Sequence, residues 1–442
     1  MKNLKSNKFL HSWGLYPKSE QIAHPVSWLS DVSSKLEEIF SENGETIAYG
    51  NGRSYGDSCY AANDHLLHTR NLNKFISVDW INGRVVAESG VTLEEILSVS
   101  IPNGWFLAVT PGTKFVTLGG ALANDVHGKN HHVRGTFGCN TLSFGLIRSD
   151  LGSVKCSRTE NEELFSATIA GLGLTGIITW VEIQLIPIKS TQVDTTIMRF
   201  NSLSDFFLLS EDLDAKHEYG VAWIDCLAKG EKLGRGVYIV GNHSKYGDLS
   251  VRSPKKLSLP FTPPISLVNK ITLLGFNNLY WYKHKSKPQK IKTDFDSFFY
   301  PLDGINNWNR MYGKAGFQQY QCIIPNYSAK EIIKDLLREI SKSGQGSFLA
   351  VLKQCGNIKS PGLISFPCAG VSLALDFPMT FNLLKLFKKL DFIVLQSGGR
   401  LYPAKDAHMS ADLFKQFYSN WGELEKLRDP HLNSKFWKRV TL

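Results

Sequence analysis

The stretch Tyr49-Gly-Asn-Gly-Arg-Ser-Tyr-Gly-Asp-Ser58 has three glycines within seven residues and follows a short strand-like run, Thr46–Tyr49. Glycine permits positive φ and lets a ligand approach the backbone closely. Successive backbone N–H groups in such a loop form an anion nest, and Arg53 and Ser54 add a positive charge and a hydroxyl donor. The loop therefore suits a pyrophosphate, although its spacing is not the dinucleotide fingerprint of the doubly wound fold. A tight glycine turn explains the loop equally well when it is taken alone.

Two further glycine-rich segments follow. The first is Thr110-Pro-Gly-Thr-Lys-Phe-Val-Thr-Leu-Gly-Gly-Ala-Leu-Ala-Asn-Asp-Val-His-Gly128, which combines a Pro-Gly turn with small residues over Gly119–Ala123. Small residues let a flat ring system lie against the backbone. The second is Gly171-Leu-Gly-Leu-Thr-Gly-Ile-Ile-Thr179, which leads into a β-branched run. It fits a backbone clamp on a cofactor ring, or a simple turn or bulge.

A histidine cluster follows the first of these two segments. His127 and His131 have the i, i+4 spacing of metal ligands on a helix, and His132 is adjacent. No acidic or cysteine residue stands out as a third ligand. We therefore expect no metal.

Length and composition indicate a globular protein of two domains. The chain has 442 residues and a formal net charge of +10, which favours anionic partners such as nucleotides, phosphorylated substrates or an acidic membrane surface. No nucleic-acid-binding motif accompanies the charge, so we expect no nucleic acid. The seven cysteines include no C-x-x-C pair, which predicts free thiols in a reducing, cytoplasmic compartment. The basic N-terminus lacks an apolar core for a signal peptide, and no run of ~18 apolar residues predicts a spanning helix.

Periodicity predicts alternating strands and helices. In Thr92-Leu-Glu-Glu95, Thr92 is the expected N-cap and Glu95 the N3 residue of a helix. Strands are expected over Thr46–Tyr49, Arg84–Glu88, Gly176–Ile186, Gln318–Ile324, Ser347–Leu352 and Val371–Phe377. Helices are expected over Ser30–Ser41, Thr92–Ile101, Ser204–Leu213, Ala329–Lys342 and Phe381–Leu390, and in the charged tail from Arg400, apart from Pro430.

The stretch 242–292 differs from the rest of the chain. It mixes lysine and arginine with proline, leucine and aromatic residues, and its prolines argue against one long helix. A basic and apolar surface of this kind fits contact with an anionic bilayer, or a lid over a site. An ordinary insertion packed on its own domain is the alternative.

The three glycine segments together resemble the FAD-binding domain of the vanillyl-alcohol oxidase/p-cresol methylhydroxylase superfamily. Within it, further motifs resemble the decaprenylphosphoryl-β-D-ribose oxidase family in order from about residue 12 to the C-terminus. Those motifs are Gly52-Arg-Ser-Tyr-Gly-Asp57, His127-Gly-Lys-Asn-His-His132, Pro301-Leu-Asp303, Trp308-Asn-Arg310, Gln319-Tyr-Gln321, Asp376-Phe-Pro378 and Gly399-Arg-Leu-Tyr-Pro-Ala-Lys-Asp406. The stretch 242–292 matches only loosely.

The resemblance implies an α+β, two-domain flavoprotein of the vanillyl-alcohol oxidase type. The FAD-binding domain would comprise residues 1–190 and 400–442. The substrate-binding (cap) domain, with an antiparallel sheet and flanking helices, would comprise residues 191–399.

The resemblance also implies an activity. It is FAD-dependent oxidation of a sugar secondary hydroxyl to a ketone, at the 2′-hydroxyl of a polyprenylphosphoryl ribose used for cell-envelope glycan. A separate NADH-dependent short-chain reductase would complete the inversion to arabinose, so this chain would be one subunit of an epimerase system. An FAD-dependent alditol or aldonolactone oxidase acting on a free small sugar is the alternative enzyme. A flavin-free binding protein that retains the fold is the alternative from another class.

The site residues are carried over position by position. Catalytic roles fall to Lys405, Tyr55 and His127, and substrate contacts to Lys353, Gln319, Gln321 and Lys405. Lys405 would hold the substrate alkoxide by charge or, with a depressed pKa, act as base. The residues expected to bind FAD are Gly50, Asn51, Gly52, Arg53, Ser54, Tyr55, Gly56, Asp57, Pro111, Gly112, Thr113, Val116, Thr117, Gly120, Ala123, Asn124, Val126, His127, Gly128, Gly176, Ile177 and Tyr402.

Two departures from relatives carry expectations. Relatives with covalent flavin place a histidine in the first glycine loop, where this chain has Arg53-Ser54, so we expect FAD to be held non-covalently. Family members sensitive to nitroaromatic inhibitors carry a cysteine two residues before the aspartate of Asp376-Phe-Pro378, where this chain has Ala374. Covalent capture by such inhibitors should therefore fail, and the exact sugar stays open.

Overall fold

The computed structural model describes residues 10–251 and 257–442. The basic N-terminal residues 1–8 and the pair Lys255–Lys256 lie outside the described residues. Helices combine with mainly antiparallel sheets, so the predicted α+β class is confirmed. No helix in the two described ranges is both long and apolar enough to cross a membrane.

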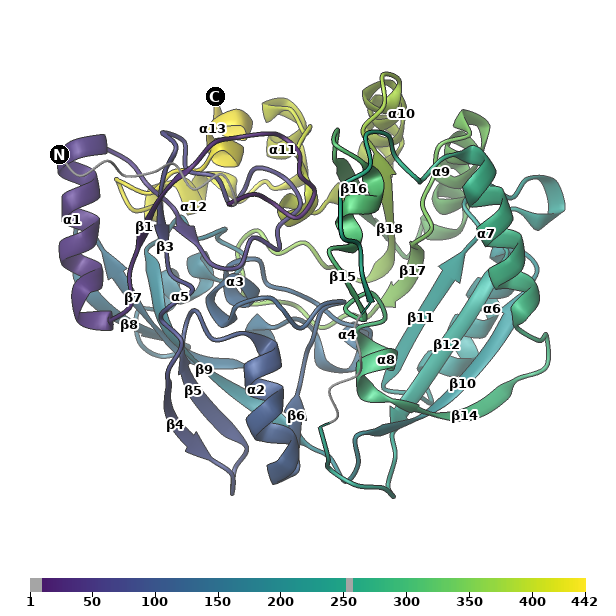
Figure 1. Cartoon of the computed structure of the whole chain (residues 1–442), viewed down its shortest axis with the longest axis horizontal. Coiled ribbons are helices and arrows are strands. Elements are labelled where there is room, and N and C mark those ends of the chain that lie inside the picture. The colour runs from purple at the N-terminus through teal and green to yellow at the C-terminus, as the bar shows by residue number, and fades with distance from the viewer. Residues whose placement is uncertain (1–9, 252–256) are drawn as a thin grey trace.

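The first part of the chain holds two sheets (Figure 1). A parallel sheet has the order β1-β3-β2, and an antiparallel sheet has the order β4-β5-β9-β7-β8, with β6 paired to β9. Its elements are β1 (Ile22–Pro25), α1 (Val32–Asn43), β2 (Ala48–Tyr49), β3 (His65–His68), β4 (Phe75–Asp79), β5 (Arg84–Glu88), α2 (Leu93–Ser100), β6 (Trp105–Leu107), α3 (Leu118–Ala123), α4 (His131–Arg134), β7 (Thr141–Arg148), β8 (Gly152–Ser157), α5 (Glu162–Thr168) and β9 (Ile177–Pro187).

The second part is built on one large antiparallel sheet of eight strands, in the order β14-β10-β12-β11-β17-β18-β16-β19. A short parallel pair, β13-β15, lies beside it. The elements are β10 (Gln192–Phe200), α6 (Leu203–Asp214), β11 (Tyr219–Ile224), β12 (Gly236–His243), β13 (Leu257–Ser258), α7 (Lys270–Lys283), β14 (Gln289–Asp294), α8 (Phe295–Phe299), β15 (Ile305–Asn306), β16 (Phe317–Pro325), α9 (Ala329–Ser343), β17 (Ala350–Cys355), β18 (Gly370–Pro378), α10 (Leu383–Gln396) and β19 (Arg400–Leu401).

The C-terminal tail returns to the first part of the molecule (Figure 1). Bridges join Thr46 to Leu432 and Ala61 to Ser434. The tail consists of α11 (Ala411–Phe417), α12 (Trp421–Leu427) and α13 (Lys435–Thr441). Because β19 still pairs with β16 of the large sheet, the chain crosses from one part to the other just after Leu401, which brings the segment around Lys405 between them.

Local patterns explain most of the elements. Helix α9 buries Ile333, Leu336, Leu337 and Ile340 along one stripe, as a 3.6-residue period requires. At the start of α2 the expected capping box is confirmed: the Glu95 N–H donates to Thr92 Oγ1 at 3.3 Å, and the Thr92 N–H donates to Glu95 Oε2 at 2.7 Å.

Several predicted bounds need correction. The strand expected over Ser347–Leu352 begins at Ala350; before it, the Ser347 hydroxyl donates to the Leu349 carbonyl at 2.7 Å in a local turn. Only Ala48–Tyr49 of the expected Thr46–Tyr49 strand is in a sheet. The tail is three short helices separated by loops. Strands β10, β11 and β12 were not predicted.

Candidate active site

A cavity of about 560 Å³ opens between the glycine segments and the large sheet. Both parts of the chain and the segment after β19 contribute to its wall. The sequence-predicted residues that line it are Gly50, Asn51, Gly52, Arg53, Ser54, Tyr55, Pro111, Gly112, Thr113, Val116, Thr117, Gly120, Ala123, Asn124, Val126, His127, Gly128, Gly176, Gln319, Gln321, Lys353, Tyr402 and Lys405. Residues from six separate stretches of sequence thus meet at one space.

Three residues expected to bind FAD do not line this cavity. Ile177 is buried within β9. Gly56 packs against the turn that follows Tyr402, where a Cβ would lie 1.6 Å from the Asp406 carbonyl oxygen. The Asp57 carboxylate accepts two hydrogen bonds from Arg439, at 2.9 and 2.7 Å. The loop motif predicted an anion site here, but a carboxylate in the loop needs a cation of its own, and Arg439 supplies it.

The first glycine loop presents a buried cation to the cavity. The Arg53 guanidinium lies 4.2 Å from the centre of the Trp13 ring and 5.5 Å from that of Phe115. Its Nε is buried and has no hydrogen-bond partner among the described residues. Asn51 Nδ2 donates to the Phe115 carbonyl at 2.8 Å, which ties the first glycine segment to the second.

The second segment packs tightly on the first. Thr117 caps α3, accepting from the Gly120 N–H at 3.3 Å. A Cβ on Gly50 would lie 2.4 Å from Thr117 Oγ1, so this contact admits only glycine without rearrangement. The two segments therefore form one continuous wall.

Lys405 lies inside the wall, against an aromatic ring. Its Nζ is 3.7 Å from the centre of the Tyr55 ring. Burial lowers the pKa of Lys405, and the negative charge of Asp376 opposes that shift. Burial also raises the pKa of Tyr55 well above its usual range, with the Asp376 charge adding to the effect. A buried amine with a depressed pKa beside a protonated phenol is an arrangement that can accept and pass a proton.

Asp376 and Gln319 form a pair just behind this amine. Gln319 Nε2 donates to Asp376 Oδ1 at 2.7 Å. Asp376 Oδ2 is buried without a hydrogen-bond partner among the described residues. Burial raises the pKa of Asp376, while the Gln319 hydrogen bond and the Lys405 charge lower it.

His127 contacts Gln321 in the cavity wall. The two Nε2 atoms lie 3.1 Å apart. Burial lowers the pKa of His127 well below its usual value, and the charges of Lys353, His131 and Lys405 act in the same direction. The ring is therefore neutral, and the Gln321 amide donates to its Nε2. That leaves the ring proton on Nδ1, which is buried and has no partner in the part of the chain that the structure describes.

The ring of Tyr402 lies 5.4 Å from that of His127. Its hydroxyl donates to the Asn124 carbonyl at 2.7 Å, which fixes the segment after β19 to the second glycine segment. Residues 10–251 and 257–442 contain no group of three His, Cys, Asp or Glu placed to hold a metal.

Two more lysines enter the cavity beside His127. Lys353 Nζ donates to the Gly128 carbonyl at 2.8 Å, and burial lowers its pKa. Lys129 Nζ donates to the Phe298 carbonyl, and burial lowers its pKa to about 7. Lys129 was not among the predicted site residues, although it stands in the His127-Gly-Lys-Asn-His-His132 motif.

Comparisons with known proteins agree with this geometry. A family model described as an FAD binding domain matches residues 27–157. Decaprenylphosphoryl-beta-D-ribose oxidase of Mycolicibacterium smegmatis is 34% identical over 399 residues, which cover 87% of this chain and 86% of that protein. The chain belongs to the decaprenylphosphoryl-β-D-ribose oxidase family. It is a two-domain flavoprotein of the vanillyl-alcohol oxidase type and an FAD-dependent oxidoreductase.

More distant relatives cover less of the chain. A Streptomyces coelicolor protein without an assigned activity is 30% identical over 354 residues, 76% of this chain and 95% of that protein. L-Gulonolactone oxidase of Mus musculus is 24% identical over 188 residues, 42% of this chain and 41% of that protein.

The residues present fit FAD. The unpartnered Arg53 Nε and His127 Nδ1 are buried donors facing the cavity, which suits a ligand with phosphate and carbonyl oxygens. The small residues Gly120 and Ala123 leave flat backbone exposed to the same space. Cys59 also reaches the cavity, but burial raises the pKa of its thiol to about 12, so it is a poor nucleophile for attachment to a flavin.

Some functional residues escaped sequence reasoning. Trp13 and Phe115 flank Arg53, and Asp376 stands behind Lys405. Asp376 belongs to the recognised Asp376-Phe-Pro378 motif, so a signal for it was present. Trp13 lies in the Ser12-Trp-Gly14 stretch where the resemblance begins, and Phe115 lies in the second glycine segment. Their partnership with Arg53 was not predicted, because it depends on contacts distant in the sequence.

Proposed function

We propose that this flavoprotein oxidises the 2′-hydroxyl of a polyprenylphosphoryl ribose to a ketone, as a step in making a cell-envelope glycan precursor. The observation that carries the proposal is Lys405, a buried amine held on the Tyr55 ring where the glycine segments meet the large sheet. The similarity to a protein named for decaprenylphosphoryl ribose supports the substrate class.

Non-covalent FAD forms part of the proposal. Arg53 and the backbone of the glycine segments would hold its pyrophosphate, and the Gly120–Ala123 stretch would lie along its rings. When bound, FAD supplies the acceptor for the hydride that leaves the carbinol carbon. Precipitation with acid should release the yellow colour into the supernatant, whereas a yellow pellet would contradict non-covalent binding.

Lys405 is the proposed base. Its lowered pKa makes the neutral amine available to take the hydroxyl proton as the carbinol carbon loses its hydride. In this proposal the Tyr55 hydroxyl relays that proton, and His127 orients the substrate through its Nδ1–H. The substrate thus loses a proton and a hydride in total, which converts the secondary alcohol to a ketone.

The two cations beside His127 suit the phosphate of such a substrate. Lys353 of β17 and Lys129, which follows the second glycine segment, both line the cavity. Gln319 and Gln321 line the wall of the same cavity, where an amide can bind sugar hydroxyls. Ala374 lines the same wall, so no thiol stands at that position.

The keto sugar needs a second enzyme to complete an epimerisation. We infer an NADH-dependent short-chain reductase as that partner and a cytoplasmic site of action, at the inner face of the membrane where the lipid-linked sugar resides. Seven free cysteines are consistent with a reducing compartment.

The stretch 242–292 supports contact with an anionic membrane. Residues 249–293 contain nine lysines or arginines and no aspartate or glutamate. This excess of positive charge favours binding to membranes that contain acidic lipid. Helix α7 buries Leu273 and Trp281 but exposes apolar residues on its other side. The exposed residues on α7 are Ile271, Leu279 and Tyr282, and Leu257, Phe261 and Ile265 are exposed in the segment before it. These six residues are together called the α7 surface.

The α7 surface adjoins the rim of the cavity. Strand β13 pairs with β15, and the Leu259 N–H donates to the Asn306 carbonyl at 3.1 Å. Ser258 and Asn306 both line the cavity. A polyprenyl chain leaving the cavity would therefore pass along apolar side chains to the bilayer. A free polyol needs no such surface.

Anaerobic reduction of the bound flavin tests the substrate. Polyprenylphosphoryl ribose should bleach the visible absorption band of the flavin, whereas free alditols and aldonolactones should not. Bleaching by the free sugars alone would overturn the lipid-linked substrate in favour of an alditol or aldonolactone oxidase. A purified protein without a flavin band would overturn both.

Flotation with vesicles tests the membrane contact separately. The protein should float with vesicles that contain phosphatidylglycerol and less with phosphatidylcholine alone, because lysines attract anionic headgroups. Replacing Ile271 and Leu279 together by aspartate should abolish flotation. Leu208→Asp changes a similarly exposed leucine on α6 and should not. Flotation that survives the double change would contradict contact through α7.

A further inference from the structure

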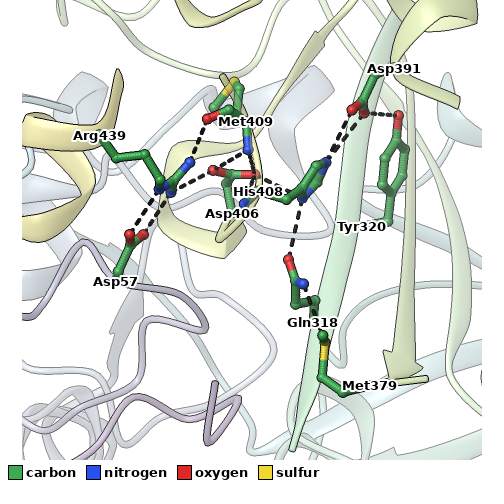
Figure 2. Close-up of polar contacts among 9 residues, drawn as sticks. All are labelled: Asp57, Gln318, Tyr320, Met379, Asp391, Asp406, His408, Met409 and Arg439. Carbon is green, nitrogen blue, oxygen red and sulfur yellow. Dashed lines mark hydrogen bonds and ion pairs between the residues drawn. The ribbon is translucent and has the colours of Figure 1, made fainter. Parts of the chain in front are cut away.

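A network of charged side chains, most of them buried, joins Asp406, the residue after Lys405, to the C-terminal tail (Figure 2). Arg439 of α13 binds the Asp57 carboxylate through two nitrogens and also donates from Nη2 to Asp406 Oδ2 at 3.0 Å. Asp57 belongs to the first glycine loop, whereas Asp406 directly follows Lys405. Arg439 therefore joins two segments that both reach the active site.

His408 extends this network of charged side chains to the large sheet and α10 (Figure 2). Its Nδ1 lies 3.1 Å from Asp406 Oδ1 and 3.3 Å from Gln318 Oε1. Its Nε2 lies 3.3 Å from Asp391 Oδ2. The Tyr320 hydroxyl donates to the other Asp391 oxygen at 3.0 Å.

The contacts of His408 decide its protonation. Both ring nitrogens face oxygens that can only accept: the carboxylates of Asp406 and Asp391 and the amide oxygen of Gln318, whose nitrogen is turned to the Met379 sulfur. A neutral imidazole has one N–H, so one of these contacts would be unfavourable. An imidazolium satisfies both.

The charge balance leads to the same conclusion. Among the residues drawn in Figure 2, the carboxylates of Asp57, Asp406 and Asp391 are buried, and Arg439 is the only cation apart from His408. A neutral His408 would leave two excess negative charges in a buried setting, which is costly. Burial and the Arg439 charge lower the pKa of His408, but Asp406 and Asp391 outweigh them, so its pKa is raised.

This network of charged side chains holds the turn that carries Lys405 in place. The Met409 N–H donates to Asp406 Oδ1 at 3.0 Å, and the Met409 carbonyl accepts from Arg439. On the other side of the turn, the Tyr55 N–H donates to the Ala404 carbonyl at 3.0 Å. Lys405 thus lies between one anchor in the glycine loop and another in the buried charges.

We propose that protonated His408 is a positioning residue, which together with Arg439 holds the 403–409 turn and thereby keeps Lys405 on the Tyr55 ring. Loss of its proton at alkaline pH loosens the turn. The catalytic consequence rests on the proposed role of Lys405, but the structural consequence does not.

Thermal unfolding of the full-length flavoprotein across pH 5–10 tests the structural consequence. A histidine whose folded pKa is raised contributes stability that is complete below its unfolded pKa of ~6.5 and is lost as pH rises through the folded pKa. The deficit in Tm of His408→Gln should therefore be largest at low pH and should shrink as the pH rises through the folded pKa of His408. Asp391→Asn should move that loss to lower pH.

Phe387→Leu is the matched control, because the Phe387 ring packs 4.6 Å from the His408 ring but carries no charge. Its deficit in Tm should not depend on pH in this way. A deficit of His408→Gln that is equally constant from pH 5 to 10 would overturn the proposal, since it would show a packing role alone.

Steady-state kinetics test the positioning of Lys405. His408→Gln should lower kcat about tenfold or more with little change in KM, because small displacements of a reacting group slow the chemical step. A rise in KM with unchanged kcat would overturn the positioning role. If no substrate reduces the flavin at all, the proposed function fails, and the unfolding profile still decides whether His408 holds the turn.

Discussion

Lys405 has properties that no single residue around it would give. Burial lowers its pKa, the Asp376 carboxylate behind it limits that change, and the Tyr55 ring favours the cationic form. These opposing effects keep the amine close to the balance between its two forms. That balance is what a general base near neutral pH requires.

Replacing Lys405 separates the role of a base from that of a charge. Lys405→Met should slow flavin reduction by ~10²-fold or more while FAD stays bound. Lys405→Arg should fail almost as badly, because a guanidinium keeps its proton. In the unmodified protein the rate should rise with pH through a pKa below the ~10.4 of free lysine. Stopped-flow reduction at several pH values measures all three, and an active arginine variant would contradict the base.

The sequence identified single residues best where they lay inside recognised motifs. Lys405, Tyr55, His127 and Arg53 all reach the cavity as expected. Asp57 was also expected to bind FAD, but its carboxylate binds Arg439 and does not line the cavity. A motif does not report which neighbour neutralises a carboxylate. Arg439, which does so, lies 382 residues further along the chain.

At the scale of elements, strong local periods were reliable guides. Helix α9 and strands β5, β16 and β18 match their predicted ranges to within a residue at each end. Strands β10, β11 and β12 were missed. Their positions depend on partners such as β14 and β17, far away in the sequence, and local patterns do not report such pairing. The prolines of the stretch 242–292 argued against one long helix. Helix α7 forms within that stretch, between Pro264 and Pro288.

The contact between the first glycine loop and the Lys405 turn can be tested by adding one methyl group. Gly56→Ala would place its Cβ 1.6 Å from the Asp406 carbonyl oxygen, so the loop and the turn must separate. We expect a loss of ~1–3 kcal/mol in the free energy of unfolding, as for other overpacked sites, together with weaker flavin reduction. Chemical denaturation measures the first effect.

Gly422→Ala provides the control for this change. Gly422 lies in α12 with open space around its Cβ position, so alanine should leave stability unchanged or raise it slightly through helix propensity. Equal losses in both variants would show that the loop and the turn do not need their close contact.

At the scale of the whole molecule, the cavity joins parts of the fold that otherwise have separate sheets. Its wall takes residues from the first glycine loop, from the large sheet and from the segment after β19. A ligand that fills the cavity contacts both parts of the fold. It cannot bind the unfolded chain in the same way, because the cavity exists only in the folded protein. Ligand binding should therefore stabilise the entire protein by mass action.

Adding FAD or riboflavin to the flavin-free protein tests this linkage and the role of Arg53 together. FAD at 100 times its Kd should add ~2.7 kcal/mol to the free energy of unfolding. Riboflavin at the same concentration should add less, because it lacks the pyrophosphate that Arg53 is proposed to bind.

Arg53→Met, which keeps an apolar contact with Trp13, should reduce the shift in Tm produced by FAD and leave that produced by riboflavin unchanged. Equal reductions for both ligands would place Arg53 away from the pyrophosphate, since only a phosphate contact distinguishes the two flavins at this residue.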